Sequence, residues 1–241
     1  MLKYYLLLFT ILISSQLHPA NYYVDSMLGN DSFNGLSESS AWKSINKINQ
    51  RNFNAGDQIL FKRGQTFTGK IELINDSGTL SQPIVISAYG DNTLPKPIIN
   101  AGSNSHSINL QLCEYIEISN LEITGEGIEI TAWGSSSTPE FFRNFHLHNL
   151  HIRNVNSSTA ISFIVGNVNN RTFSDITIEN CLIEDIIGAG ITVNKWAGTN
   201  DNGTPNDTSD DTPATPDEYY HENLNILNNT IRRVNKAGIQ I

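Results

Sequence analysis

Four segments after residue 115 repeat one pattern, in which alternating apolar residues lead to an asparagine and an isoleucine follows three residues later. The segments are 116–123, 145–152, 176–183 and 224–231, and their asparagines are Asn120, Asn149, Asn180 and Asn228. A second short apolar strand pattern follows each of them, at 127–130, 160–163, 190–193 and 238–241. The steps between the asparagines are 29, 31 and 48 residues. A repeat of this period is typical of a solenoid.

The repeat predicts an all-β fold, a parallel β-helix with three strands in each coil. One strand is the Gly-Ile-x-Ile segment, a second ends at the repeated asparagine, and a third is the short piece that ends at the isoleucine. Because every coil turns in the same sense, the strands should be parallel and should enclose a continuous core. Asparagine suits the bend because it tolerates the left-handed conformation and can hydrogen-bond to the same bend in the next coil.

Composition and charge agree with this fold and narrow the choice of partners. Hydrophobic residues make up 39% and charged residues 16% of the 241 residues, which favours short strands joined by polar turns. The formal net charge of −9 argues against non-specific binding to nucleic acid or to an anionic membrane. An acidic polysaccharide remains a candidate substrate if the groove is basic or if a cation bridges the charges.

Residues 1–20 are predicted to be a secretory signal. Lys3 supplies the positive charge, and the apolar stretch 4–13 is too short to span a bilayer. The alternative is an uncleaved anchor. No other segment is apolar enough to cross a membrane, so the sequence predicts a secreted monomer, extracellular or periplasmic, with no membrane span after removal of the signal.

Residues 21–241 are predicted to form a single β-helix domain. Its amino-terminal cap, residues 21–60, should contain a short helix that begins at Ser39 or Ser40 and buries Trp42, Ile45 and Ile48 against the open end of the core. Regular coils are expected from about residue 107. The chain ends in the middle of a coil, which predicts a domain truncated at its carboxyl end, a fragment of a longer protein.

Two further features concern the coils. The 48-residue step contains an insertion, Gly198 to Asp217, that is rich in Asp, Asn, Thr, Gly and Pro. Insertions in solenoids often form loops on the binding face.

The two cysteines, Cys113 and Cys181, fall in different coils, and two coils of separation exceed the reach of a disulfide. We therefore expect free, buried thiols.

These coils resemble the right-handed parallel β-helix proteins of the pectate-lyase-like group. The amino-terminal block is also similar to a module of that group, through the segments 22–24, 29–31, 34–35, 41–42, 56–61 and 63–64. The resemblance covers roughly residues 21–241 and implies a right-handed solenoid. The group includes polysaccharide lyases, glycoside hydrolases, epimerases, phage tailspikes and adhesins, so the fold does not select an activity.

The outer face of the Gly-Ile-x-Ile sheet is the first candidate binding surface. Aligning the coils stacks Glu129, Ser162, Thr192 and Gln240 in one column, and Thr131, Ile164 and Asn194 in the next. Trp133 and Trp196 follow at equivalent positions. Exposed indoles beside polar columns suit sugar rings, and we assign Trp133, Trp196, Glu129, Thr192 and Asn194 to substrate binding. The alternative is that both tryptophans pack under a loop.

Lys195, beside the acidic insertion, is the second candidate. The resemblance implies that lyases of the group use a Lys or Arg as base and an acidic cluster that holds calcium. Such an ion neutralises charge that develops next to a uronate carboxylate. Lys195 is therefore a candidate base, and Asp207, Asp210 and Asp211 are candidate calcium ligands. The ordinary alternative is a solvated loop.

The remaining polar residues give weaker signals. His146 and His148 are two residues apart, hence on one strand face, and with His151 nearby they could bind zinc, although a solvated face is the alternative. Glu184, next to Asp185, is a candidate acid or base of a hydrolase, but neighbouring strand residues point apart. Arginines that could contact an acidic sugar, or simply carry surface charge, are Arg143, Arg153, Arg232 and Arg233.

The sequence thus predicts a carbohydrate-active enzyme that acts on an extracellular polysaccharide by elimination or by hydrolysis. A uronate-containing polysaccharide is one candidate substrate. The alternative is a cell-surface, adhesin-type protein that binds glycans without catalysis. An enzyme should gather ionisable residues at one level of the groove, whereas an adhesin should show a long repetitive polar face. The irregular charged level near Lys195 favours an enzyme.

Overall fold

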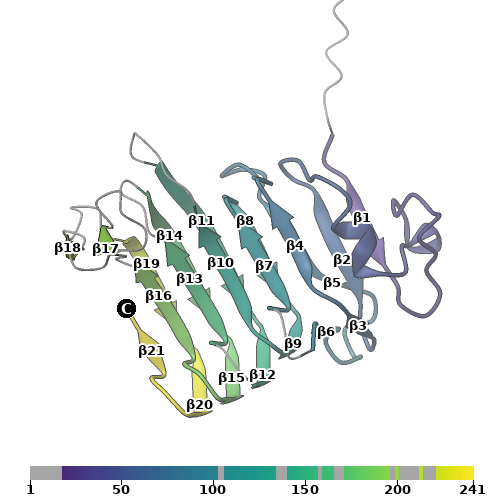
Figure 1. Cartoon of the computed structure of the whole chain (residues 1–241). Helices are drawn as coiled ribbons and strands as arrows, with labels where there is room; N and C mark the ends of the chain where they lie inside the picture. Colours follow the sequence, from purple (N-terminus) through teal and green to yellow (C-terminus); the bar gives the residue numbers. More distant parts are fainter. Residues whose placement is uncertain are drawn as a thin grey trace, which may run out of the picture.

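Three parallel β-sheets wind into a right-handed β-helix, in which successive coils lie side by side along the axis (Figure 1). The computed structural model describes residues 18–102, 106–133, 140–156, 159–165, 171–195, 199–200, 212–213 and 221–241. Its three parallel sheets confirm the all-β fold class predicted from the repeat. Within the described ranges, no helix is both long and apolar enough to cross a membrane.

Each sheet takes one strand from each coil. Sheet A contains β1 (Asn21–Val24), β2 (Gln58–Lys62), β5 (Ile84–Tyr89), β8 (Ile116–Ser119), β11 (Glu140–His148), β14 (Arg171–Glu179) and β19 (Glu222–Leu227). Sheet B contains β3 (Thr66–Thr68), β6 (Ile98–Asn100), β9 (Glu122–Gly125), β12 (His151–Val155), β15 (Leu182–Ile186) and β20 (Thr230–Val234). Sheet C contains β4 (Ile71–Ile74), β7 (Ile108–Gln111), β10 (Ile128–Ala132), β13 (Ile161–Val165), β16 (Ile191–Lys195) and β21 (Ile239–Gln240).

A coil passes from sheet A through the asparagine bend to sheet B, then to sheet C, and returns to sheet A. The strands pair without interruption along sheet C, where Ile108, Ile128, Ile161 and Ile191 occupy one register position and are fully buried. Alternate residues of a strand point to opposite faces, so this column lines the core and its neighbours line the outer face. Within the insertion, β17 (Thr199–Asn200) and β18 (Thr212–Pro213) form an antiparallel pair.

The repeated asparagines form the predicted bends between sheets A and B. All four have positive φ angles, from 51° to 59°, which asparagine tolerates better than most residues. The side-chain amide of Asn149 donates to the Oδ1 atom of Asn120, 2.5 Å away in the preceding coil. Lys96 also donates to the Oδ1 atom of Asn149, at 2.9 Å. The bend thus joins neighbouring coils.

Substituting Asn149 separates its two roles. We expect Asn149→Ala to lower the free energy of unfolding by about 2 kcal/mol, since alanine loses the hydrogen bonds and is strained at positive φ. Asn149→Gly should cost about half as much, because glycine adopts this conformation freely. Denaturant unfolding of both variants measures the difference. Equal losses would show that backbone strain does not contribute.

The amino-terminal cap differs from the predicted single helix. A 3₁₀ turn, η1 (Glu38–Ser40), and a short helix, α1 (Ile45–Ile48), flank Trp42, which forms a β-bridge with Val24. Trp42 cannot continue a helix because its amide and carbonyl both bond to the β1 segment. Its ring stacks on Tyr22 with centroids 5.1 Å apart. Ile45 and Ile48 are buried, as the apolar face predicted.

The coils also begin earlier than about residue 107. The strands β2, β3 and β4 already supply one member to each sheet, so the first coil begins at Gln58. The asparagine pattern does not mark these coils because glycine makes the bend instead. Gly64 follows β2 at a φ angle of 75°, and Gly90 follows β5 at a φ angle of 97°. Glycine and asparagine both tolerate this region, which is why they exchange here.

The two cysteines are free and buried, as predicted. Cys113 and Cys181 point into the core, where burial raises the pKa of the Cys113 thiol to about 12 and that of Cys181 to about 11. Thiols with such values stay protonated at neutral pH and behave as small apolar side chains.

Candidate functional site

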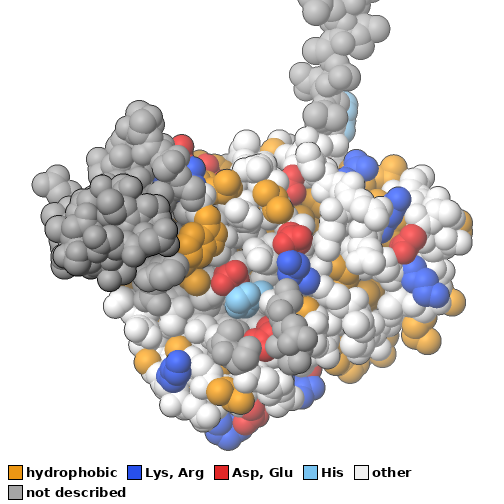
Figure 2. All heavy atoms as spheres, viewed as in Figure 1, with side chains coloured by type: hydrophobic (Ala, Val, Ile, Leu, Met, Phe, Trp, Pro, Cys, Tyr) orange, Lys and Arg blue, Asp and Glu red, His pale blue; other side chains and the backbone are white. Residues whose placement is uncertain are grey.

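The outer face of sheet C has the register that the repeat predicts. Glu129, Ser162, Thr192 and Gln240 pair in one column, and Thr131, Ile164 and Asn194 pair in the next. The columns predicted from the sequence are therefore confirmed. Figure 2 shows one face of the solenoid, where acidic, basic and histidine side chains lie near the middle beside hydrophobic ones.

The columns are less accessible than a sugar platform requires. Thr131, Ser162 and Thr192 are only 3–5% exposed. Their short hydroxyl side chains lie close to the sheet, and Ser162 donates back to the carbonyl of Ile128 at 3.4 Å. Glu129 reaches the surface, where its carboxylate lies 3.5 Å from the Nδ1 atom of His106. The prediction of Thr192 as an exposed sugar contact is therefore not supported by its burial.

The other predicted members of this face are placed only in part. Trp133 is 36% exposed at the end of β10, and its carbonyl accepts a hydrogen bond from Arg171. Asn194 and Lys195 belong to β16, but their side chains lie outside the described residues. Trp196 and the candidate calcium ligands also lie outside them, namely Asp207, Asp210 and Asp211. The base and calcium assignments stay predictions.

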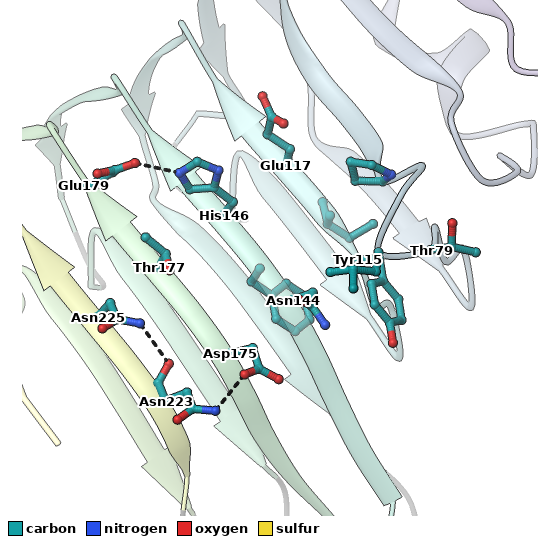
Figure 3. Close-up of a pocket in the computed structure, with 14 residues that line it drawn as sticks. Thr79, Tyr115, Glu117, Asn144, His146, Asp175, Thr177, Glu179, Asn223 and Asn225 are labelled. Atoms are coloured by element: carbon teal, nitrogen blue, oxygen red, sulfur yellow. Dashed lines mark hydrogen bonds and ion pairs between the residues drawn. The ribbon is translucent and has the colours of Figure 1, made fainter.

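A groove on the outer face of sheet A is the better-defined candidate site (Figure 3). Its volume is about 490 Å³, and residues of β8, β11, β14 and β19 line it together with the 79–83 turn. Glu117, His146, Thr177 and Asn225 occupy one register position in four successive coils. Leu80 and Pro83 add an apolar edge. The groove combines apolar contact with carboxylate, imidazole, hydroxyl and amide groups.

Local backbone geometry positions the far end of the groove. Asn144, Asp175 and Asn223 have φ angles of 62°, 54° and 53°, so the same left-handed residue recurs within β11, β14 and β19. The side-chain amide of Asn223 donates to the Oδ1 atom of Asp175 at 2.8 Å (Figure 3). Asparagine and aspartate tolerate this conformation. Because this conformation recurs in three successive coils, the side chains of Asn144, Asp175 and Asn223 all line the groove.

Two histidines and two glutamates pair across the coils at the other end. His146 and His148 share one strand face, as predicted, and their rings stack with centroids 4.3 Å apart. The Nε2 atom of His146 lies 2.9 Å from Glu179, and that of His148 lies 3.1 Å from Glu117. Neither glutamate was predicted from the sequence. Aligning the asparagine bends would have found them, because this alignment places Glu117 opposite His146 and Glu179 opposite His148.

Glu184 lies on the outer face of sheet B, away from the groove residues. Its carboxylate accepts hydrogen bonds from His151, Arg232 and Arg233, at 2.7–2.9 Å. These partners, His151 foremost, lower the pKa of Glu184 to about 2. Such a carboxylate stays ionised at neutral pH and suits a structural ion pair better than the general acid proposed from sequence. Arg153 in the same column instead bonds Glu122 at 2.8 Å.

This ion pair makes stability depend on pH. The folded-state pKa of Glu184 lies below its ordinary value of 4.5, so its stabilisation is present above about pH 4.5 and is lost as the pH falls through about 2. We expect Glu184→Gln to lower the thermal midpoint at neutral pH, with a difference from the parent that shrinks toward pH 2. The exposed Glu222→Gln is the control. A difference that does not vary with pH would contradict the assignment.

Comparisons with known proteins give relatives that share one name. No protein-family model matches the chain. Over 91% of its length, the chain is 29% identical to lacto-N-biosidase of Bifidobacterium longum subsp. longum, of which it covers 16%. Two crystal structures of GH136 lacto-N-biosidase from Eubacterium ramulus are 22% identical. The selenomethionine derivative has a TM-score of 0.67 and the native protein 0.65, over 91% and 88% of this chain and 42% and 41% of theirs.

These likenesses show a β-helix fold shared with carbohydrate-active proteins. The chain spans less than half of the solved structures and 16% of the curated relative. The predicted β-helix is therefore confirmed, whereas membership of the pectate-lyase-like group stays a prediction.

Proposed function

We propose that this chain forms the β-helix of a secreted glycoside hydrolase that acts on an extracellular glycan. The observation that carries the proposal is its 29% identity to a lacto-N-biosidase across 91% of the chain. The structural likeness extends over the same share of the chain and supports a common coil arrangement. Because a β-helix hosts many activities, the fold alone would not support this choice.

Hydrolysis is better supported than elimination. The relatives are named as biosidases, which cleave glycosidic bonds by hydrolysis. Elimination was proposed from Lys195 and the acidic insertion, and neither side-chain set belongs to the described residues. We therefore propose a hydrolase, and the named relatives give no support for a uronate-containing substrate.

The groove of sheet A is the surface that we assign to glycan contact. It offers donors and acceptors on successive coils, such as Thr177 and Asn225, and an apolar edge at Leu80. Sugar rings need both, since their faces are apolar and their hydroxyl groups form hydrogen bonds. Strands spaced by one coil, about 4.8 Å, repeat these groups at an interval close to the length of a sugar unit.

Incubating the protein with p-nitrophenyl lacto-N-bioside and with a panel of polysaccharides tests this proposal. We expect p-nitrophenol or new reducing ends without the ultraviolet absorbance of unsaturated uronates. Absorbance from unsaturated uronates would establish a lyase and overturn the proposal. Binding without any cleavage, across the whole panel, would instead establish the adhesin-type alternative.

The groove itself is tested by glycan binding. Asn225→Ala removes one side-chain amide and should weaken binding about fivefold, the effect of one hydrogen bond. Glu38→Ala, an exposed change in the amino-terminal cap, is the matched control and should bind as the parent does. Equal binding by both variants would place the glycan elsewhere.

A further inference from the structure

Three side chains on the outer face of sheet A converge on one point. Glu117 of β8 and the two histidines of β11, His146 and His148, offer ligand atoms that all lie within 4.8 Å of one another. They come from two adjacent coils that are hydrogen-bonded as parallel strands. Their side chains are partly accessible, with exposed fractions of 29%, 43% and 26%. An ion could therefore enter from solvent without opening the core.

We propose that Glu117, His146 and His148 form a site for a divalent transition metal ion, zinc in the first instance. Two imidazoles and one carboxylate are a ligand set that zinc uses when a fourth position is left to water or another ligand. Imidazole favours zinc, copper and nickel, whereas calcium and magnesium prefer oxygen ligands alone. The three side chains therefore suit a transition metal ion at this site better than calcium or magnesium.

The geometry requires little rearrangement. Zinc binds these atoms at about 2.0–2.2 Å, so ligands of a tetrahedral site lie roughly 3.4 Å apart. Side-chain rotation can close the present separation to that value, because the strands beneath stay paired. Glu117 and His148 already approach to 3.1 Å in a hydrogen bond, whose proton the ion would replace.

Glu179 supplies a second feature expected of a metal site. Its carboxylate lies 2.9 Å from the Nε2 atom of His146, while the other ring nitrogen is turned toward the strand of Glu117 (Figure 3). Histidine ligands commonly donate their second nitrogen to a carboxylate, which fixes the ring and strengthens it as a ligand. Glu117 and Glu179 together also offset the charge of a divalent ion.

The site would link two coils at one end of the groove. Glu117, His146 and Glu179 all line the groove, so a fourth ligand position on the ion would be open to water or to a bound molecule there. Binding to the folded chain alone would also raise its stability.

Calorimetric titration of the chelator-treated protein with zinc chloride tests the proposal. We expect saturable binding in the parent and the loss of one equivalent in Glu117→Gln and in His148→Gln. Glu179→Gln should retain the equivalent but bind it 10–100-fold more weakly, on the order expected for an outer-shell carboxylate. His151→Gln is the control, because both ring nitrogens of His151 face carboxylates of sheet B, Glu122 and Glu184.

Cobalt(II) provides a second readout that does not depend on a variant folding correctly. In the parent, visible absorption bands of cobalt with nitrogen ligands should appear and should disappear when zinc is added. Unchanged zinc titrations of Glu117→Gln and His148→Gln, or a cobalt spectrum without nitrogen ligation, would overturn the site and leave a simple histidine–glutamate ion pair. Both outcomes are independent of whether the protein hydrolyses glycans.

Discussion

Replacing Phe163 with alanine is expected to lower the free energy of unfolding by about 3–5 kcal/mol. Phe163 of β13 is fully buried in the core of the solenoid. Its ring meets Phe145 and Phe173 edge to face, at centroid distances of 5.4 Å and 5.3 Å. These two rings come from sheet A and lie 5.6 Å apart, so the three rings close a triangle between sheets.

The size of this effect follows from the coil geometry. Removing a ring from a solenoid leaves a cavity that the surrounding strands cannot close, because each strand is hydrogen-bonded to the coils on both sides. The lost edge-to-face contacts add to the transfer term. Denaturant unfolding, followed by circular dichroism, measures the change.

Leu80→Ala provides the control for this measurement. Leu80 is 78% exposed, so its truncation should change stability by no more than about 0.5 kcal/mol. A loss below about 1 kcal/mol in Phe163→Ala would show that the rings do not pack as described.

Asp25→Ala should be the second large loss, about 3–5 kcal/mol, because it removes a buried carboxylate and leaves its hydrogen-bond donors without their acceptor. Asp25 is 1% exposed at the end of β1, and its Oδ2 atom lies 2.9 Å from the Nζ atom of Lys62. Its Oδ1 atom accepts hydrogen bonds from the amides of Met27 and Leu28 and from Gln65. One carboxylate thus ties the cap loop to the first coil.

The pKa of Asp25 agrees with this role. Burial alone would raise it, but the hydrogen bonds from Leu28, Gln65 and Lys62 outweigh burial and lower the pKa to about 2. Since the folded-state value lies below the ordinary 3.8, the stabilisation is present above about pH 4 and is lost as the pH falls through about 2.

Thermal and denaturant unfolding at neutral and acidic pH measure the effect of Asp25→Ala. Glu38→Ala, an exposed carboxylate in the same cap, should leave stability within about 0.5 kcal/mol of the parent. A loss of similar size in both variants, or a loss in Asp25→Ala that persists unchanged at pH 2, would contradict the role of the ion pair.

Much of the fold was predictable because a solenoid repeats one local solution. The spacing of apolar residues and asparagines located the strands, the bends and the register from β8 onward, and the columns on sheet C paired as aligned. The first two coils fall outside the asparagine repeat because Gly64 and Gly90 make bends that the later coils make with asparagine. Trp42 left the predicted helix because its backbone groups pair with the β1 segment, a contact distant in sequence from the helix pattern.

The candidate site was less predictable, because register does not determine exposure or partner. Alignment placed Thr192 on an outer face, but only the packed structure shows that it is buried. It named His146 and His148 as a pair, but not the carboxylates on the neighbouring strands that approach them. For Glu184, the arginines that hold its charge come from the next coil, 48 and 49 residues later.

The sequence by itself determined the solenoid, since its period dictates that each coil must stack on the last to bury its apolar face. Only the tertiary structure decided which polar groups meet. Stacking brings residues about one coil apart in sequence to within hydrogen-bond distance, and side-chain rotation then selects the partners, as Glu117 and Glu179 cross to His148 and His146. These contacts depend on rotamers and burial, which the period of the repeat does not contain.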